Sequence, residues 1–536
     1  MGETKYILAI DLGTSACKVA LATTAGEIVA LETGETRLHL LPGGGAEQDP
    51  EDWWAAIKNA SGRLMARGLA APADVVAVAC TAQWSGTVPV DRNGRPLMPA
   101  IIWMDSRGAP YARQIASGAV KVQGYGLDKL WRWVRKTAGI PAGSGKDSIA
   151  HILYLKHERP EIYRTTYKFL EPKDYLNLRL TGQFAASYDS IALHWVTDNR
   201  DLPRVHYDDE LLRLAGIDRE KLPDLKQAVD ILGPLWPEAA ADLGLTTDTV
   251  VVMGTPDVQS AAIGSGATRD FQAHLYVGTS SWLTCHVPYK KTDLFHNMAT
   301  LPSAIPGRYF VANEQESAGV CLTFLRDNVF FHEDELLVAA GEAKPARNAY
   351  QAFDRLAAQA PPGSGGVIFT PWLYGERTPV EDRFIRGGFH NLSLQTTRPD
   401  LVRAVFEGVA YNTRWLLGAV EGFVHRRLDP IRFIGGGARS DVWSQIFADV
   451  LDRTIEQVRD PVEANVRGAA ILAAVALGHL TFDTVTDRVQ VANVYRPQPE
   501  NRQRYGELYR AFLDLYRRNR EIHVRLNSKH PGDLHS

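Results

Sequence analysis

The stretch Asp11-Leu12-Gly13-Thr14-Ser15 ends a short apolar run, and after Lys18 a second apolar run extends from Val19 to Thr23. Two such runs around a short turn predict a β-hairpin. Glycine lets the backbone of the turn approach a ligand closely, and successive N–H groups and hydroxyls there form a concavity that binds anions. The turn is therefore either an ordinary hairpin turn or a phosphate loop, whose contacts would be Gly13, Thr14, Ser15 and Lys18.

The same pattern returns about half a chain later. The run from His274 to Val277 enters Gly278-Thr279-Ser280-Ser281, and the apolar stretch from Trp282 to Val287 follows as the expected second arm of a hairpin. One loop alone would fit two ordinary hairpins equally well, because short motifs often match by chance. The repetition favours a polyphosphate held from both sides, with Gly278, Thr279 and Ser280 as the second set of contacts.

Length and composition restrict the class of protein. At 536 residues the chain is too long for a single hydrophobic core, so two or three domains are expected. Its 45% hydrophobic and 23% charged residues are typical of a soluble globular protein. The net charge of -3 argues against nucleic acid and anionic membranes as partners. No apolar stretch is long enough to cross a bilayer, and the first five residues lack the apolar core of a signal peptide.

The four cysteines, Cys17, Cys80, Cys285 and Cys321, are scattered, with no Cys-x-x-Cys pair and no histidine at zinc spacing. Three of them lie in apolar surroundings, which favour buried free thiols, and free thiols fit the reducing cytoplasm. We therefore expect a cytoplasmic protein and no zinc or redox role for these residues.

Strands and helices alternate along the chain, which predicts an α/β fold in both halves. The clearest strands lie within 6–30, 75–81, 250–254, 367–370 and 431–434, and the clearest helices at 51–67, 149–157, 172–180, 400–417, 468–477 and 501–525. A short helix from Val258 to Ile263, closed by Gly264 and Gly266, marks the predicted boundary between the domains 1–266 and 267–536. The last helix carries the apolar stripe Tyr505, Leu508, Phe512 and Tyr516 and is expected to pack rather than to bind nucleic acid.

Two aspartates are the candidate chemical groups. Asp257 follows the strand at 250–254 and stands on a turn into a helix, where open α/β sheets place their ligands. Its carboxylate could take a proton from an attacking hydroxyl, or it could simply cap the helix. Asp11, beside the first loop, is the candidate Mg²⁺ ligand, or a turn residue that caps its own backbone.

Other motifs carry weaker signals. Gly435-Gly436-Gly437-Ala438-Arg439-Ser440-Asp441 joins a strand to a helix, where a nucleoside can lie on bare backbone. Gly143-Ser144-Gly145-Lys146 resembles part of a Walker A motif but lacks its spacing, so no phosphate role is expected. Gln83-Trp84-Ser85-Gly86 and the cluster of Trp103, Asp105 and Arg107 offer indole faces and hydrogen-bonding groups suited to a sugar. The alternative is that these are core tryptophans with polar neighbours.

Together these segments resemble the FGGY family of carbohydrate kinases over nearly the whole chain. The resemblance also rests on Pro371-Trp372-Leu373, Gly375-Glu376-Arg377-Thr378-Pro379 and Arg403-Ala404-Val405-Phe406-Glu407-Gly408. It implies a duplicated actin-like, ribonuclease-H-like α/β ATPase fold, in which an N-terminal sugar-binding lobe and a C-terminal nucleotide-binding lobe enclose a central cleft. It implies ATP and Mg²⁺ as cofactors, small-molecule partners only, and allows a homodimer.

The resemblance also implies roles for residues of this chain. Asp257 is the general base, Asp11 and Asp257 lie near Mg²⁺, and Thr14 and Thr279 face the phosphates. The nucleotide site would include Gly436, Gly437, Ala438, Asp441 and Gln445. The substrate site would include Gln83, Trp84, Ser85, Trp103, Asp105, Arg107 and Asp257.

Departures from the family pattern affect the predicted substrate. The nearest subgroup is xylulokinase-like, but Trp84-Ser85 stands where xylulokinases have Met-His, and Val258 stands where a polar residue is usual. We expect ATP-dependent phosphorylation of a sugar, with a ketopentose such as xylulose first and another ketose or a polyol as alternatives. A non-catalytic sugar-binding regulator and an actin- or chaperone-like ATPase are the competing functions.

Overall fold

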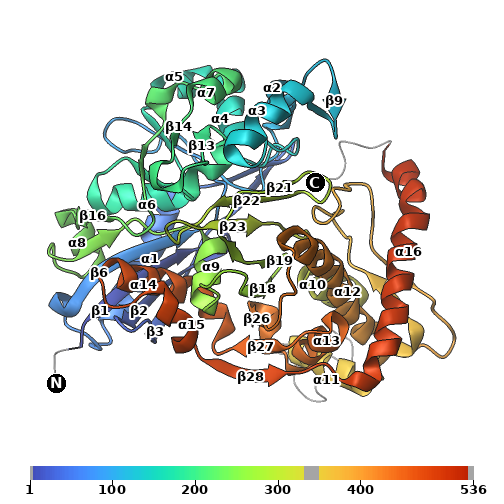
Figure 1. Ribbon diagram of the computed structural model, residues 1–536. Helices are drawn as coiled ribbons and strands as arrows, with labels where there is room; N and C mark the ends of the chain where they lie inside the picture. Colours follow the sequence, from blue (N-terminus) through green and yellow to red (C-terminus); the bar gives the residue numbers. More distant parts are fainter. Residues whose placement is uncertain (1–3, 331–348, 529–536) are drawn as a thin grey trace.

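The computed structural model describes residues 4–330 and 349–528, which form two α/β halves side by side (Figure 1). The first half is built on a six-stranded sheet whose order is β16-β17-β6-β1-β2-β3. β1 and β2 form the predicted hairpin, with Asp11 paired to Lys18, and β1 runs parallel to β6. The strands are β1 (Tyr6–Leu12), β2 (Ala16–Thr23), β3 (Ile28–Glu35), β6 (Val75–Ala82), β16 (Ile231–Pro234) and β17 (Val250–Val252).

The second half repeats this topology in a five-stranded sheet with the order β19-β18-β26-β27-β28. Its strands are β18 (Ala273–Val277), β19 (Ser281–Thr284), β26 (Ile431–Ile434), β27 (Ile455–Val458) and β28 (Val491–Tyr495). β18 again forms a hairpin with the next strand and runs parallel to a strand from much later in the chain, β26. This duplication confirms the predicted actin-like, ribonuclease-H-like fold.

The second hairpin differs from the prediction in one arm. The stretch from Trp282 to Val287 is not a single strand, because β19 ends at Thr284 and β20 (His286–Val287) pairs with β23 (Tyr309–Ala312) in another sheet. The remaining strands are β4 (His39–Leu41), β5 (Gly45–Gln48), β7 (Val88–Val90), β8 (Ala100–Ile101), β9 (Lys121–Val122), β10 (Tyr125–Gly126), β11 (Lys168–Leu170), β12 (Ala185–Ser187), β13 (Thr197–Asp198), β14 (His206–Tyr207), β15 (Asp224–Lys226), β21 (Thr292–Asp293), β22 (Met298–Pro302), β24 (Ile368–Thr370) and β25 (Gly388–His390).

The described residues form sixteen α-helices. They are α1 (Pro50–Met65), α2 (Ala109–Ala116), α3 (Leu127–Thr137), α4 (Ser148–Glu158), α5 (Pro160–Thr165), α6 (Pro172–Thr181), α7 (Asp209–Ala215), α8 (Pro237–Leu243), α9 (Asp257–Ser265), α10 (Val320–Phe324), α11 (Ala349–Gln359), α12 (Arg398–Val424), α13 (Asp441–Leu451), α14 (Ala464–Ala476), α15 (Phe482–Arg488) and α16 (Arg502–Asn527). The predicted stripe of α16 packs as expected, since Tyr505, Leu508 and Phe512 are buried in the core of the second half.

Two of these helices, α9 and α14, pack against each other between the two sheets (Figure 1). Side chains alternate along β1, so Leu8 and Ile10 face the side of α1 while Ile7 and Ala9 face α14. α14 belongs to the second half of the sequence but lies on β1 and β6 of the first sheet. The two halves therefore share one hydrophobic cluster rather than meeting only at a polar surface.

The end of α9 corrects a detail of the sequence analysis. The helix runs through Gly264 to Ser265, and only Gly266, with φ 83°, ends it. Position 264 inside the helix requires glycine because α14 passes so close that a Cβ atom there would overlap the carbonyl of Ala464.

All four cysteines are buried free thiols, as predicted for three of them. Among the described residues, no helix is both long and apolar enough to span a membrane.

Candidate active site

Asp257 is the first residue of α9, directly after the turn that follows β17. The helix N-cap is Pro256, so Asp257 is not the capping residue that the alternative interpretation required. Its Oδ1 accepts a hydrogen bond from Val258 N at 2.8 Å. Burial, followed by the negative charge of Asp11, raises the pKa of the Asp257 carboxyl to about 7. A carboxyl with this pKa is suited to accept a proton near neutral pH.

Asp11 lies at the end of β1, and its negative charge acts on the Asp257 carboxyl. Lys18 Nζ donates to Asp11 Oδ2 at 2.8 Å, and this ion pair raises the pKa of Lys18. Asp11 Oδ1 is buried and has no hydrogen-bond partner among the described residues. An unsatisfied buried carboxylate oxygen is unusual and leaves a ligand position for a cation.

Asp11 and Asp257 fit a Mg²⁺ ion whose other ligands would come mainly from a bound nucleotide. Within the described residues, no group of three or more His, Cys, Asp or Glu side chains forms a metal site. Mg²⁺ is commonly bound by one or two carboxylates, with substrate phosphates and water as its other ligands. The free Oδ1 of Asp11 and the adjacent Asp257 match that donor set.

The first loop is joined directly to the predicted sugar residues. Thr14 Oγ1 donates to Gln83 Oε1 at 3.0 Å and accepts from Trp103 Nε1 at 2.9 Å. Gln48, which the sequence analysis did not identify, accepts from Gln83 Nε2 at 2.6 Å and donates to Thr14 O at 2.7 Å. The loop hydroxyl, Gln83 and Trp103 therefore lie in one hydrogen-bonded group.

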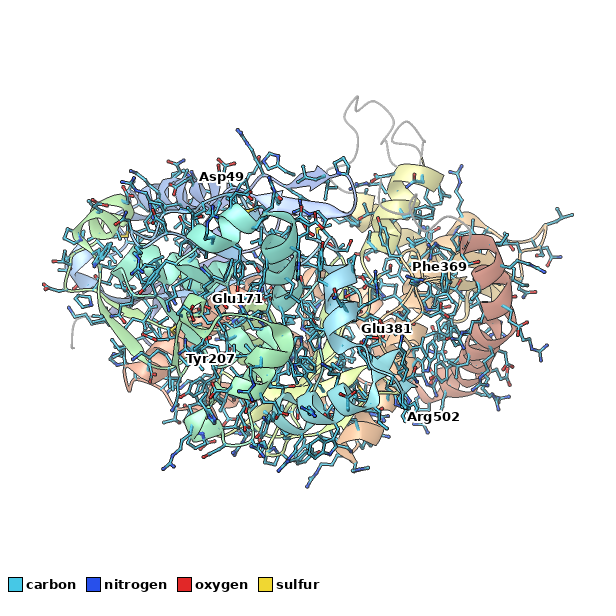
Figure 2. All side chains as sticks on the ribbon, turned by 90° about the horizontal axis from the view of Figure 1, so that it is seen from above. Asp49, Glu171, Tyr207, Phe369, Glu381 and Arg502 are labelled. Atoms are coloured by element: carbon cyan, nitrogen blue, oxygen red, sulfur yellow. The ribbon has the colours of Figure 1, made fainter. Side chains whose placement is uncertain are left out.

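The rest of the turn at residues 83–86, which is predicted to bind the sugar, is held by hydrogen bonds to neighbouring segments. Trp84 Nε1 donates to Ser190 O at 2.9 Å, Ser85 Oγ donates to Lys146 O at 2.7 Å, and Gly86 N donates to Glu171 at 2.9 Å. Glu171 lies inside the first half of the molecule (Figure 2). Lys146 ends the Gly-Ser-Gly-Lys stretch, so the structure places this stretch beside the turn at residues 83–86.

Asp105 and Arg107 bind each other. Arg107 Nε donates to Asp105 Oδ2 at 2.9 Å, and the same guanidinium donates to Glu47 at 2.6 Å. Asp105 is almost completely buried, and its Oδ2 also accepts from Ala46 N. The pair thus joins the loop after β8 to β5.

The second loop reaches the same region from the other half. Gly278 N donates to Ser280 O at 2.9 Å, and Gly319 N donates to Gly278 O at 2.8 Å, while the Thr279 side chain is exposed. Tyr276, two residues before the loop, interacts electrostatically with Asp257, Lys18 and Asp11. The two repeated loops and the two acids are therefore brought together across the boundary between the halves.

The glycine-rich segment lies at the end of β26. Gly436 is exposed, and a Cβ atom there would meet no atom within 4 Å, so its backbone is open to a ligand. Ala438 is buried and its carbonyl accepts from Gln457. Asp441 Oδ1 accepts from Tyr495 at 2.7 Å, and the Gln445 amide donates to Asp449 at 2.8 Å, so both side chains are already hydrogen-bonded within the protein.

Two further groups near Asp257 were missed by the sequence analysis, Tyr276 and Glu314. Glu314 raises the pKa of Asp257 through its negative charge and forms an ion pair with Arg377. Arg377 belongs to the Gly-Glu-Arg-Thr-Pro stretch and also donates to Glu316 at 2.9 Å. No local pattern marks Tyr276 or Glu314, because each reaches the site only through the packing of the second half.

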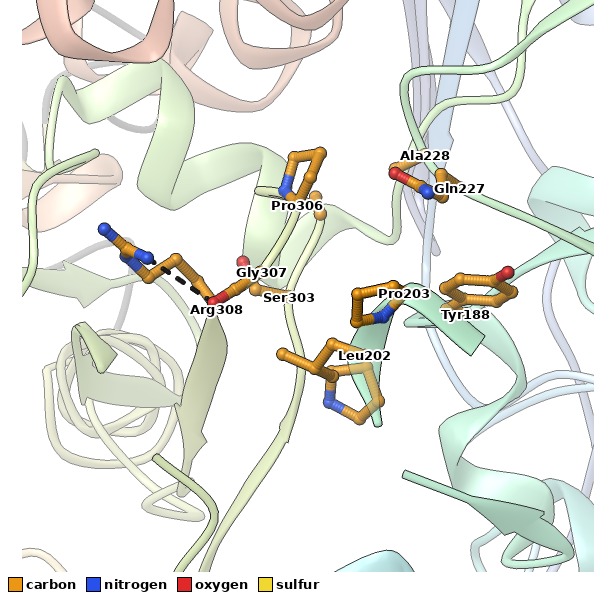
Figure 3. Close-up of a pocket in the computed structure, with 11 residues that line it drawn as sticks. Tyr188, Leu202, Pro203, Gln227, Ala228, Ser303, Pro306, Gly307 and Arg308 are labelled. Atoms are coloured by element: carbon orange, nitrogen blue, oxygen red, sulfur yellow. Dashed lines mark hydrogen bonds between the residues drawn. The ribbon is translucent and has the colours of Figure 1, made fainter. Parts of the chain in front are cut away.

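A small cavity of about 70 Å³ also lies between the halves (Figure 3). Its walls include Tyr188 and Pro203 from the first half and Ser303, Pro306 and Arg308 from the second. None of the predicted site residues lines it.

Comparison with known proteins identifies the family. The family model "FGGY family of carbohydrate kinases, N-terminal domain" matches residues 6–264, and the corresponding C-terminal model matches residues 273–477. The chain belongs to the FGGY family of carbohydrate kinases. As a carbohydrate kinase it phosphorylates a sugar hydroxyl with ATP.

Relatives of this carbohydrate kinase include proteins named xylulose kinase and gluconokinase. It is 28% identical over 521 residues to a xylulose kinase of Staphylococcus epidermidis, a match that covers 97% of this chain and 98% of that protein. It is 26% identical over 517 residues to a gluconokinase of Bacillus subtilis, covering 96% of each. The structure of a ligand-bound xylulose kinase from Lactobacillus acidophilus shares its fold, with a TM-score of 0.84 and 24% identity over 98% of this chain and 100% of that one.

Proposed function

We propose that this carbohydrate kinase transfers the γ-phosphoryl group of ATP to a hydroxyl of a ketopentose such as xylulose, with Asp257 as the general base. The observation that carries the proposal is the position of Asp257. It stands at the boundary between the halves, beside Asp11 and Lys18 and within electrostatic range of Tyr276. Its raised pKa gives it the proton affinity that a base needs near neutral pH.

The proposed mechanism assigns each part of the site one task. Gly13, Thr14, Ser15 and Lys18 hold the phosphates from one side, and Gly278, Thr279 and Ser280 hold them from the other. Asp257 accepts the proton of the attacking hydroxyl. Asp11, with Asp257, would hold Mg²⁺, which neutralises the negative charge of the phosphates when it is bound. Closure of the two halves would exclude water and limit hydrolysis of ATP.

We assign the sugar-binding residues to the N-terminal lobe and the nucleoside-binding residues to the C-terminal lobe. We assign Gln83, Trp84, Ser85, Trp103, Asp105 and Arg107 to the sugar side, the last two as a buried ion pair that supports Trp103. We assign Gly436, Gly437, Ala438, Asp441 and Gln445 to the nucleoside side, with the open backbone at Gly436 as support. The lobes are proposed to divide after Gly266, which agrees with family models that end at residue 264 and resume at 273.

Xylulose is proposed ahead of gluconate because the xylulose kinase of Staphylococcus epidermidis is 28% identical to this chain, against 26% for the Bacillus subtilis gluconokinase, at similar coverage. We further infer a cytoplasmic location, which four free thiols favour. A homodimer stays a prediction from the sequence.

The test is a screen for sugar-dependent ADP release over pentuloses, hexuloses, polyols and gluconate, followed by Asp257→Asn. We expect xylulose to give the highest kcat/KM and the variant to lose roughly two to four decades of kcat, the usual contribution of general base catalysis. Thermal stability and ATP binding should remain close to the wild type. Near-normal turnover by Asp257→Asn would refute the base, and saturable sugar binding without turnover by the wild type would refute the kinase reaction in favour of a regulator.

A further inference from the structure

Tyr276 occupies a fixed position in the second hairpin. It lies on β18 directly opposite Trp282 on β19. The two rings are stacked, with centroids 3.9 Å apart and an angle of 7° between their planes. The stacked indole restricts the phenol ring, so the direction of its hydroxyl is set by the hairpin.

The hydroxyl of Tyr276 lies against the second phosphate loop. A Cβ atom on Gly278 would overlap this hydroxyl, so the loop can pass there only because residue 278 is glycine. The ring packs in the cluster shared by the two halves, together with Val258, the neighbour of Asp257. Tyr276 therefore connects the second loop with the catalytic turn.

Three charged groups of the first half act on the same hydroxyl. Asp257, Lys18 and Asp11 all interact with it electrostatically. Burial is the main cause that raises the pKa of Tyr276 to about 12, and the negative charge of Asp257 adds to it. The phenol thus keeps its proton at physiological pH and can act as a hydrogen-bond donor.

This donor is available to a ligand. No described residue forms a hydrogen bond with the Tyr276 hydroxyl, and the side chain is partly exposed. A partly exposed donor that lies against the second loop and interacts electrostatically with Asp257 and Lys18 could stabilise charge that develops on a transferring phosphoryl group.

We propose that Tyr276 is a further catalytic residue, whose hydroxyl donates a hydrogen bond to an oxygen of the phosphoryl group during transfer. The inference rests on the proposed function and adds a donor to the predicted loop residues. Tyr276 keeps its proton throughout, so the bond to the leaving ADP oxygen breaks and the bond to the sugar oxygen forms without covalent chemistry at the phenol. A donor that acts mainly on the transition state should affect kcat more than KM.

The test is Tyr276→Phe, which keeps the ring and its stack on Trp282. We expect kcat to fall by roughly 100-fold, the lower end of the range for removing one transition-state donor, with the KM for sugar unchanged within about twofold. The variant should bind ADP with aluminium fluoride, which mimics the transferring group, at least tenfold more weakly than the wild type, while its affinity for ADP alone is unchanged. Its melting temperature should match that of the wild type.

Tyr289→Phe is the matched control. The Tyr289 hydroxyl donates to Val424 O at 3.3 Å, and Tyr289 is not part of the proposed site. Its kcat and aluminium fluoride affinity should be those of the wild type. Wild-type kcat and aluminium fluoride affinity in Tyr276→Phe would overturn this inference alone, whereas absence of sugar-dependent ADP release in the wild type would overturn the proposed function.

Discussion

At the scale of single residues, the environment of Asp257 decides how the site can act. Burial and two nearby negative charges, Asp11 and Glu314, raise its pKa, while Lys18 and the Val258 N–H lower it. The balance leaves the carboxyl near its titration point at neutral pH. A small change in the surrounding charge should therefore change the fraction of active base.

This balance predicts the pH dependence of the reaction. A protonated Asp257 cannot accept a proton, so activity should fall about tenfold for each pH unit below about 7 and should level off above it. Glu314→Gln removes one negative charge that raises the pKa of Asp257, so the acidic limb should move to lower pH. The measurement is kcat/KM for the sugar between pH 5 and 9, with the exposed Glu27→Gln as control. An unshifted limb in Glu314→Gln would show that this charge does not act on Asp257.

At the scale of elements, the contact between α9 and α14 holds the catalytic turn in place. The helices approach so closely that a Cβ atom on Gly468 would overlap Ser260 O, and one on Gly264 would overlap Ala464 O. Ser260 lies one helical turn after Asp257. Any change that separates the two helices should therefore also move the base.

Gly468→Ala tests this contact. Overpacking of a tight interface costs about 1–3 kcal/mol, so we expect a melting temperature several degrees lower and a kcat reduced by at least tenfold. Gly418→Ala in α12 is the control, because a Cβ atom there meets no atom within 4 Å. It should leave kcat unchanged and stabilise the fold by up to about 1 kcal/mol. Thermal unfolding and ADP release measure both effects, and a wild-type melting temperature for Gly468→Ala would contradict the close approach.

At the scale of the whole molecule, the two halves are not independent units. Ile7 and Ala9 of the first sheet pack in one cluster with Val466 and Ala470 of α14, although the two pairs are separated by more than 400 residues. Removing the second half would expose this face of the first sheet. An apolar sheet face must be covered for the fold to be stable.

We therefore predict that the chain unfolds in one cooperative transition. Scanning calorimetry should give a single peak whose calorimetric and van't Hoff enthalpies agree. Residues 1–266 expressed alone should not form a stable folded domain. Two resolved transitions, or a folded and cooperatively melting fragment 1–266, would show instead that the shared cluster contributes little.

Much of this architecture could be predicted because it depends on local chemistry. The β1–β2 hairpin, the strand before Gly278 and the turn at Asp257 follow from apolar alternation and from turn residues within a few positions. The same local rules gave wrong element bounds where an element distant in the sequence packs against the segment. β20 leaves the second hairpin to pair with β23, and Gly264 lies inside α9, where the close approach of α14 leaves no room for a Cβ atom, rather than ending the helix.

The sequence by itself determined the two repeated loops, the aspartate at the strand end and the family to which the chain belongs, because each depends on short motifs of consecutive residues. Only the tertiary structure decided that Tyr276 and Glu314 lie near Asp257, and that Asp105 and Arg107 bind each other and Glu47. Most of these contacts join positions far apart in the chain, such as Arg107 and Glu47, or Asp257 and Glu314. They exist because buried polar side chains must find partners, and no local pattern specifies which partners those are.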